Sequence, residues 1–163
     1  MKTYAYGLST KKDEAVITFY PTSPANSTFY PEGKQLQKVL CAEVLGQEMS
    51  DKFFGNEVEV KVPLDRLSQF LNTDYPEVSV IDLLKIDVEG AELDVLGGVD
   101  EAHWAITQNV VVEAGNRHGE VAEIEGLLKS RGFEIATTSN KIESVDPRYK
   151  ELTNYLIVGR RTK

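Results

Sequence analysis

The ten residues from Ser79 to Val88, SVIDLLKIDV, constrain the fold more than any other part of this sequence. Their apolar side chains follow one another with little interruption, and Glu89 and Gly90 then break the run. Such a run, bounded by turn residues, is typical of a parallel strand that is buried on both faces. We therefore predict a buried parallel strand here, followed by a helix from Ala91 that ends at Gly97 and Gly98.

The rest of the chain alternates strand and helix around this run. Residues 1–57 are polar and rich in turn residues, with a strand predicted at Ala15–Tyr20 and a helix at Gln35–Leu45. Further strands are predicted at Glu57–Val62, Asn109–Glu113, Phe133–Thr138 and Tyr155–Arg160, and helices around Leu67–Leu71 and over 120–131. Strands that alternate with helices indicate a mostly parallel sheet covered by helices, so the predicted fold class is α/β.

Charge and composition exclude several classes of partner. The chain carries 18 Lys and Arg against 26 Asp and Glu, a net charge of -8, which disfavours binding to nucleic acid or to an acidic membrane surface. No apolar run reaches the ~18 residues that a membrane span needs, and the N-terminus has no apolar stretch of signal-peptide length. One cysteine and two histidines nearly exclude a Cys/His zinc site. We expect a soluble, cytoplasmic, acidic single domain.

The richest group of candidate site residues is Lys85, Asp87 and Glu89. Side chains alternate along a strand, so these three point the same way, and ligands of open α/β sheets bind at the carboxyl ends of the strands. The two carboxylates there could accept hydrogen bonds from hydroxyls or amines, coordinate a hard cation, or act as a general base. The alternative is that Glu89 and Glu92 only complement the dipole of the following helix, with Lys85 as their ion-pair partner.

The strand at Asn109–Glu113 brings further candidates. Glu113 ends a buried strand and should lie near Asp87 if the two strands are neighbours; otherwise it simply reaches water. His118 follows in a loop, where a histidine suits general-base chemistry at neutral pH, although an exposed histidine without a role fits equally well. Asn116 shares that loop. We expect His103 to be a packing or surface residue.

Three aromatic residues, Tyr20, Phe29 and Tyr30, flank the turn-rich segment PTSPANSTFYP. They either wall a substrate pocket or anchor a loop. Cys41 is expected to be a small, buried or half-buried residue without a chemical role. The sequence contains no Gly-x-Gly-x-x-Gly motif, no P-loop and no Gly-x-Ser-x-Gly elbow.

The segment IDLLKIDVEGAELDVLGG, residues 81–98, resembles the FkbM-type family of S-adenosylmethionine-dependent methyltransferases. The most specific part is the block Lys85–Gly90, an apolar strand that ends in Lys-Ile-Asp-Val-Glu-Gly. Other elements agree in order, and the resemblance covers essentially the whole chain. They are Leu64-Asp65-Arg66-Leu67, Glu113 in VVVEAG, Leu127-Leu128 and Gly132-Phe133.

The resemblance implies methyl transfer from S-adenosylmethionine to an oxygen of a small molecule or sugar. For this reaction we expect Asp87 to be the first catalytic residue, then Glu89 and Glu113, with His118 as a candidate base. The implied partner is a small-molecule methyl acceptor; no cofactor-binding residue and no metal ligand is assigned. The alternative is a non-catalytic α/β binding or dimerisation module derived from the same fold.

The chain departs from the family at its beginning. The family's cofactor site starts with a strand, a glycine-rich turn and a helix, followed by a strand that ends in an acidic residue; the sequence shows none of these. Residues 1–163 therefore resemble one N-terminally incomplete domain, a Rossmann-like sheet lacking its first strands. The edge of the strand at residues 79–88 would then be exposed, and exposed edges tend to pair. Four arrangements could cover this edge: a homodimer, an exchange of elements between two chains, pairing with residues 1–20, or further strands of a longer polypeptide.

Overall fold

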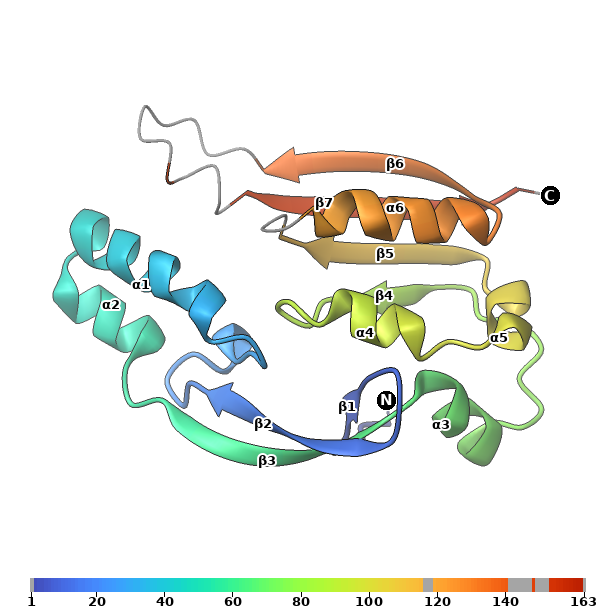
Figure 1. The fold of residues 1–163 in the computed structure, drawn as a ribbon, viewed down its shortest axis with the longest axis horizontal. Coiled ribbons are helices and arrows are strands. Elements are labelled where there is room, and N and C mark those ends of the chain that lie inside the picture. The colour runs from blue at the N-terminus through green and yellow to red at the C-terminus, as the bar shows by residue number, and fades with distance from the viewer. Residues whose placement is uncertain (1, 116–118, 141–147, 149–152, 163) are drawn as a thin grey trace.

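The computed structural model describes residues 2–115, 119–140, 148 and 153–162 (Figure 1). Its strands form two separate sheets, an N-terminal one of order β1-β3-β2 and a C-terminal one of order β4-β5-β7-β6. The strands are β1 Gly7–Leu8, β2 Asp13–Phe19, β3 Val58–Asp65, β4 Leu84–Ile86, β5 Asn109–Ala114, β6 Phe133–Asn140 and β7 Asn154–Arg161. The helices are α1 Glu32–Leu45, α2 Gln47–Phe54, α3 Leu67–Asp74, α4 Glu92–Gly97, α5 Glu101–Ile106 and α6 Glu120–Ser130, with a 3₁₀ turn at Pro24–Asn26.

The C-terminal sheet is mixed, so the prediction of a mostly parallel sheet is wrong. β4 and β5 are parallel, as predicted, but β7 is antiparallel to both of its neighbours, β5 and β6. β6 and β7 pair as one long hairpin, from Phe133 opposite Arg161 to Asn140 opposite Asn154. Strands joined as a hairpin must run in opposite directions, because a parallel pair needs a crossover that returns to the start of the first strand.

The strand β4 is shorter and more exposed than the sequence predicts. Ile86 is buried at 2% exposure, whereas Leu83 just before the strand is 56% exposed and Lys85 also faces solvent. β4 pairs with β5 on one side, and no described strand pairs with its other edge. Burial on both faces is therefore wrong for this strand, since the face of Leu84 and Ile86 packs on the core while the face of Lys85 is exposed. The homodimer through this edge stays a prediction.

The N-terminal sheet is built on β3, which pairs with β2 antiparallel and with β1 parallel. Residues 1–20 therefore contribute strands to this sheet and do not repair the edge of β4. The helix predicted at Gln35–Leu45 is confirmed as α1, and α2 follows it after Gly46, at φ 90°, as an unpredicted helical hairpin. Figure 1 shows this hairpin beyond the ends of β2 and β3, on the side where β4 and β5 end.

The buried residues of the main hydrophobic core belong to the C-terminal half, between the four-stranded sheet and the helices α4, α5 and α6, and the partly buried Leu8 and Leu67 pack against them. Trp104 of α5 packs edge-on against Phe133 of β6, with ring centroids 6.0 Å apart. The buried residues of this core are Ile86, Val95, Leu96, Val99, Trp104, Val110, Val112, Ala114, Val121, Ile124, Leu128, Phe133 and Ile157. Within the described residues, no helix combines the length and the apolar character that crossing a membrane requires.

Candidate active site

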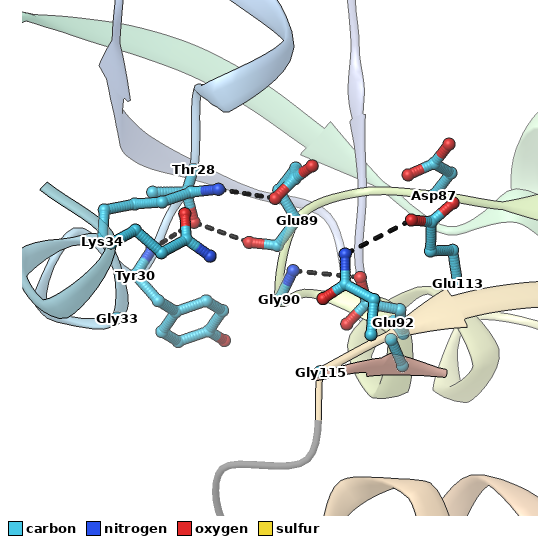
Figure 2. A pocket seen from close by; sticks show the side chains of 13 residues that line it. Thr28, Tyr30, Gly33, Lys34, Asp87, Glu89, Gly90, Glu92, Glu113 and Gly115 are labelled. Atoms are coloured by element: carbon cyan, nitrogen blue, oxygen red, sulfur yellow. Dashed lines mark hydrogen bonds and ion pairs between the residues drawn. The ribbon is translucent and has the colours of Figure 1, made fainter. Parts of the chain in front are cut away.

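A polar pocket lies where β4 and β5 end, facing the start of α1 (Figure 2). Four segments far apart in sequence supply its walls: residues 28–37, the loop after β4 with the first residue of α4, the end of β5, and Asn154 at the start of β7. This is the carboxyl end of the two parallel strands, the place where open α/β sheets bind ligands. The lining residues are Thr28, Tyr30, Gly33, Lys34, Gln37, Asp87, Glu89, Gly90, Glu92, Glu113, Ala114, Gly115 and Asn154.

Asp87 and Glu113 lie together in this pocket because β4 and β5 are neighbours, as the sequence suggested. The Lys85 ammonium contacts the Asp87 carboxylate at 2.5 Å, and this hydrogen bond raises the pKa of Lys85. Asn154 of β7 donates to Glu113 Oε1 at 3.4 Å. The Asp87 side chain keeps 39% of its surface exposed, so a ligand can reach it. Both carboxylates are placed to accept hydrogen bonds from a bound molecule.

Glu89 also lines the pocket, but its surroundings differ from those predicted. Its backbone has φ 56°, a left-handed conformation that costs a non-glycine residue of order 1 kcal/mol or more. Its carbonyl oxygen accepts a hydrogen bond from Thr28 Oγ1 at 2.7 Å, and its carboxylate pairs with the Lys34 ammonium at 2.6 Å. Lys85, which the alternative interpretation made the ion-pair partner of Glu89 and Glu92, pairs with Asp87. No pattern in the sequence pointed to Lys34, which lies 55 residues before Glu89.

Glu92 serves the start of α4, as expected, yet it also reaches the pocket. Its Oε1 accepts a hydrogen bond from the Gly90 amide at 2.9 Å, and the residue is 5% exposed. Burial raises the pKa of this carboxyl, because a low-dielectric environment disfavours the charged form. Glu92 is therefore a fourth carboxyl group at the site, one that sequence reasoning assigned only to the helix.

The aromatic residues divide between the two predicted roles. Tyr30 lines the pocket and donates its hydroxyl to Asp94 at 2.8 Å, a hydrogen bond that raises the pKa of Tyr30 to about 12. Tyr20 is 2% exposed and packs edge-on against Phe54, with ring centroids 5.9 Å apart, so it anchors the loop.

The remaining candidates lie away from the pocket or outside the described residues. His118 and Asn116 fall in the segment 116–118, which is outside the described residues. His103 is buried, with Nδ1 2.7 Å from Ser68 Oγ, and the expectation of a packing residue is confirmed. Cys41 is half-buried on α1 and lines a separate apolar groove of the helical hairpin.

The described residues offer neither a cluster of metal ligands nor a glycine-rich turn after a first strand. No three His, Cys, Asp or Glu side chains in this part of the chain are grouped so that they could hold a metal ion. Four glycines have positive φ, and they lie at helix boundaries or in the loop after β4, not in a turn between a first strand and its helix; they are Gly46, Gly90, Gly119 and Gly132. The described residues therefore line a pocket for a polar ligand, and they carry no glycine-rich turn of the kind that holds a nucleoside.

Comparison with known proteins places this pocket in a family. Residues 4–135 match the methyltransferase FkbM domain. The chain belongs to the FkbM methyltransferase family. The match includes β4, the loop after it and β5, so the FkbM domain supplies Asp87, Glu89 and Glu113 to the pocket.

Curated relatives agree with the family match. Methyltransferase sdnD of Sordaria araneosa is 40% identical over 159 residues, which cover 94% of this chain and 61% of that protein. Methyltransferase 1 of Beauveria bassiana is 36% identical over 163 residues, which cover 99% of this chain and 61% of that protein. The 31-O-demethyl-FK506 methyltransferase FkbM of Streptomyces tacrolimicus is 30% identical over 165 residues, which cover 92% of this chain and 59% of that protein. The chain thus spans about three-fifths of these relatives. No solved structure matches it significantly.

Proposed function

We propose that this chain forms the acceptor side of an S-adenosylmethionine-dependent methyltransferase that methylates a hydroxyl oxygen of a small molecule or sugar. The observation that carries the proposal is the convergence of Asp87, Glu89 and Glu113 in one polar pocket at the carboxyl ends of β4 and β5. Membership of the FkbM family supports methyl transfer, and the polar lining supports an acceptor that presents hydroxyl groups.

The chemistry asked of these residues is modest. When a hydroxyl oxygen gains a methyl group it must lose its proton, and a carboxylate within hydrogen-bond reach can take that proton. Asp87 is the proposed base, because its carboxylate lies at the pocket and remains accessible. Glu89 and Glu113 would orient the acceptor by accepting hydrogen bonds from its other hydroxyls. Correct placement of the acceptor supplies most of the rate enhancement in such a transfer.

A second candidate function is a binding or dimerisation module without catalysis. It is favoured by one observation: the described residues form no cradle for a nucleoside, although they keep the acceptor pocket. The two candidate functions differ in one property: whether this chain binds S-adenosylhomocysteine, the product that S-adenosylmethionine leaves after methyl transfer.

Titration calorimetry with S-adenosylhomocysteine separates the two. Binding at micromolar strength supports the methyltransferase, with the cofactor site completed in the assembly that this chain forms. Absence of heat at millimolar S-adenosylhomocysteine contradicts catalysis by this chain alone and favours the binding module.

The role of Asp87 is tested by Asp87→Asn in any preparation that transfers methyl groups. Transfer from tritiated S-adenosylmethionine to a set of methyl glycosides and to 31-O-demethyl-FK506 should fall about 10²–10⁴-fold, the usual effect of a lost general base. Asp82→Asn is the matched control, since Asp82 is an exposed carboxylate before the same strand and outside the pocket. The circular dichroism spectrum should not change. Full turnover by Asp87→Asn would remove Asp87 from the mechanism.

A further inference from the structure

The loop after β4 is held by contacts from the N-terminal half of the chain. Three residues of the segment 28–34 reach it: Thr28 and Lys34 contact Glu89, and Tyr30 contacts Asp94 at the start of α4. Figure 2 shows Thr28 and Lys34 on one side of the pocket, both directed at Glu89. The geometry of the pocket therefore depends on a segment that is more than 50 residues away in sequence.

Thr28 is itself fixed. It is 1% exposed, and its backbone pairs with Thr18 of β2 through hydrogen bonds of 2.9 and 3.1 Å. Its hydroxyl accepts a hydrogen bond from the Tyr30 amide at 3.0 Å while donating to the Glu89 carbonyl. The N-terminal sheet thus holds the hydroxyl that donates to the carbonyl of Glu89, a contact made at the residue with the left-handed φ.

Lys34 fixes the other end of Glu89. The Lys34 side chain is only 8% exposed, and a buried ammonium needs an anionic partner to offset its lost hydration. That partner is Glu89 Oε2, whereas the Glu89 side chain as a whole keeps 38% of its surface exposed at the pocket. The contact therefore fixes the direction of a carboxylate that a ligand can still reach.

We propose that Lys34 is a positioning residue, which together with Thr28 holds the Glu89 carboxylate in the orientation that meets the methyl acceptor. That a methyl acceptor meets Glu89 rests on the proposed function. That Lys34 and Thr28 hold the Glu89 carboxylate in place does not depend on it. It makes α1, an element of the N-terminal half, part of the acceptor site. A change at Lys34 should act through Glu89 and not through a contact of its own with the reacting atoms.

The first test uses the ¹⁵N-labelled chain without any ligand. A residue with positive φ shows a strong intraresidue NOE between its amide proton and its Hα, and Glu89 should show it in the wild type. Lys34→Met keeps the length of the side chain and removes the charge. We expect this variant to weaken that NOE and to speed hydrogen exchange of the Gly90 amide about tenfold or more, since a charged hydrogen bond to the loop is lost.

Two further variants make the result specific. Lys34→Arg retains a cation and should restore the wild-type NOE and exchange rate. Lys38→Met removes a lysine one turn further along α1, whose ammonium lies 4.0 Å from Glu57, and should leave Glu89 unchanged. An unchanged NOE and exchange rate in Lys34→Met would overturn the proposal, as would failure of Lys34→Arg to restore them in a folded protein.

The second test concerns methyl transfer, with the same glycosides and 31-O-demethyl-FK506 as probes. Lys34→Met should lower kcat/KM for the acceptor about tenfold or more, leave the affinity for S-adenosylhomocysteine within about twofold, and recover in Lys34→Arg. An unchanged kcat/KM in Lys34→Met would overturn the acceptor role. If the wild type neither transfers methyl groups nor binds S-adenosylhomocysteine, the proposed function fails, and the ligand-free NMR comparison still decides whether Lys34 positions Glu89.

Discussion

At the scale of single residues, Glu92 links the pocket to stability. Burial raises the pKa of its carboxyl, so the folded state favours the protonated form more than the unfolded state does. A group of this kind stabilises the fold fully below its unfolded pKa, and that contribution is lost as the pH rises through the raised pKa. We expect Glu92→Gln to gain stability relative to the wild type as the pH rises from about 4.5, the unperturbed value for Glu.

Urea unfolding of both proteins at pH 4 and pH 8 measures this effect. Gln keeps a carbonyl oxygen for the Gly90 amide, so the hydrogen bond at the start of α4 is preserved and only the charge is removed. The difference in the free energy of unfolding between variant and wild type should favour the variant more at pH 8 than at pH 4. A difference that does not change with pH would show that Glu92 carries no such penalty.

Single residues also show what the sequence could and could not predict about the site. Asp87 and Glu113 were found because each ends a strand of a recognisable α/β pattern, and neighbouring parallel strands bring their carboxyl ends together. Lys34 and Thr28 were not found because they come from a separate sheet, and no local periodicity relates them to Glu89. The expectation that Glu89 continues the strand alternation of Lys85 and Asp87 fails because β4 ends at Ile86 and Glu89 has a positive φ; its carboxylate pairs with Lys34, and Lys85 pairs with Asp87.

At the scale of elements, Arg161 at the end of β7 ties two helices to the sheet. Its guanidinium donates to the carbonyls of Thr107 at 2.7 Å and Arg131 at 3.0 Å, and also to that of Trp104. The planar group lies 4.5 Å from the centre of the Phe133 ring. One cation thus satisfies carbonyls at the ends of α5 and α6, which a helix leaves without internal partners.

Removing this cation should loosen the packing of both helices. We expect Arg161→Met to lower the free energy of unfolding by roughly 3 kcal/mol, because buried carbonyls lose a charged donor. Arg161→Lys should recover only part of the lost free energy, since an ammonium group cannot reproduce the planar arrangement of N–H donors of a guanidinium. Arg160→Met, one residue earlier and exposed, is the control and should change stability by no more than about 0.5 kcal/mol. Equal losses at both positions in urea unfolding would contradict this assignment.

Elements were predicted best where hydrophobic periodicity was strong. α6 and β5 were found because their apolar residues face one core at helical or strand spacing. The antiparallel direction of β7 was missed because the direction of a strand is set by its connections and not by its own residues. α2 was missed because it spans only the eight residues Gln47–Phe54, little more than two helical turns over which a periodic pattern can be recognised.

At the scale of the whole molecule, the two halves bury very different amounts of apolar surface. The buried residues of the main core lie between Ile86 and Ile157, and from the N-terminal half only the partly buried Leu8 and Leu67 pack against them within the described residues. In the N-terminal half the buried apolar residues are Tyr20, Leu40 and Phe54, and valines of β2 and β3 such as Val16 and Val58 are each 46% exposed. A sheet with an uncovered apolar face gains less free energy from burying apolar surface when it folds. We therefore expect the N-terminal sheet to open separately from the core.

Native-state hydrogen exchange in low urea tests this expectation. Amides of β5 and β7 should exchange only through global unfolding, because both strands lie inside the four-stranded sheet. Amides of β2 and β3 should exchange through a smaller opening, with a free energy lower by at least about 1 kcal/mol and a weaker dependence on urea. One shared opening free energy for all four strands would contradict this. Separate opening would carry Thr28 and Lys34 away from Glu89, so the acceptor pocket would form only while both sheets are folded.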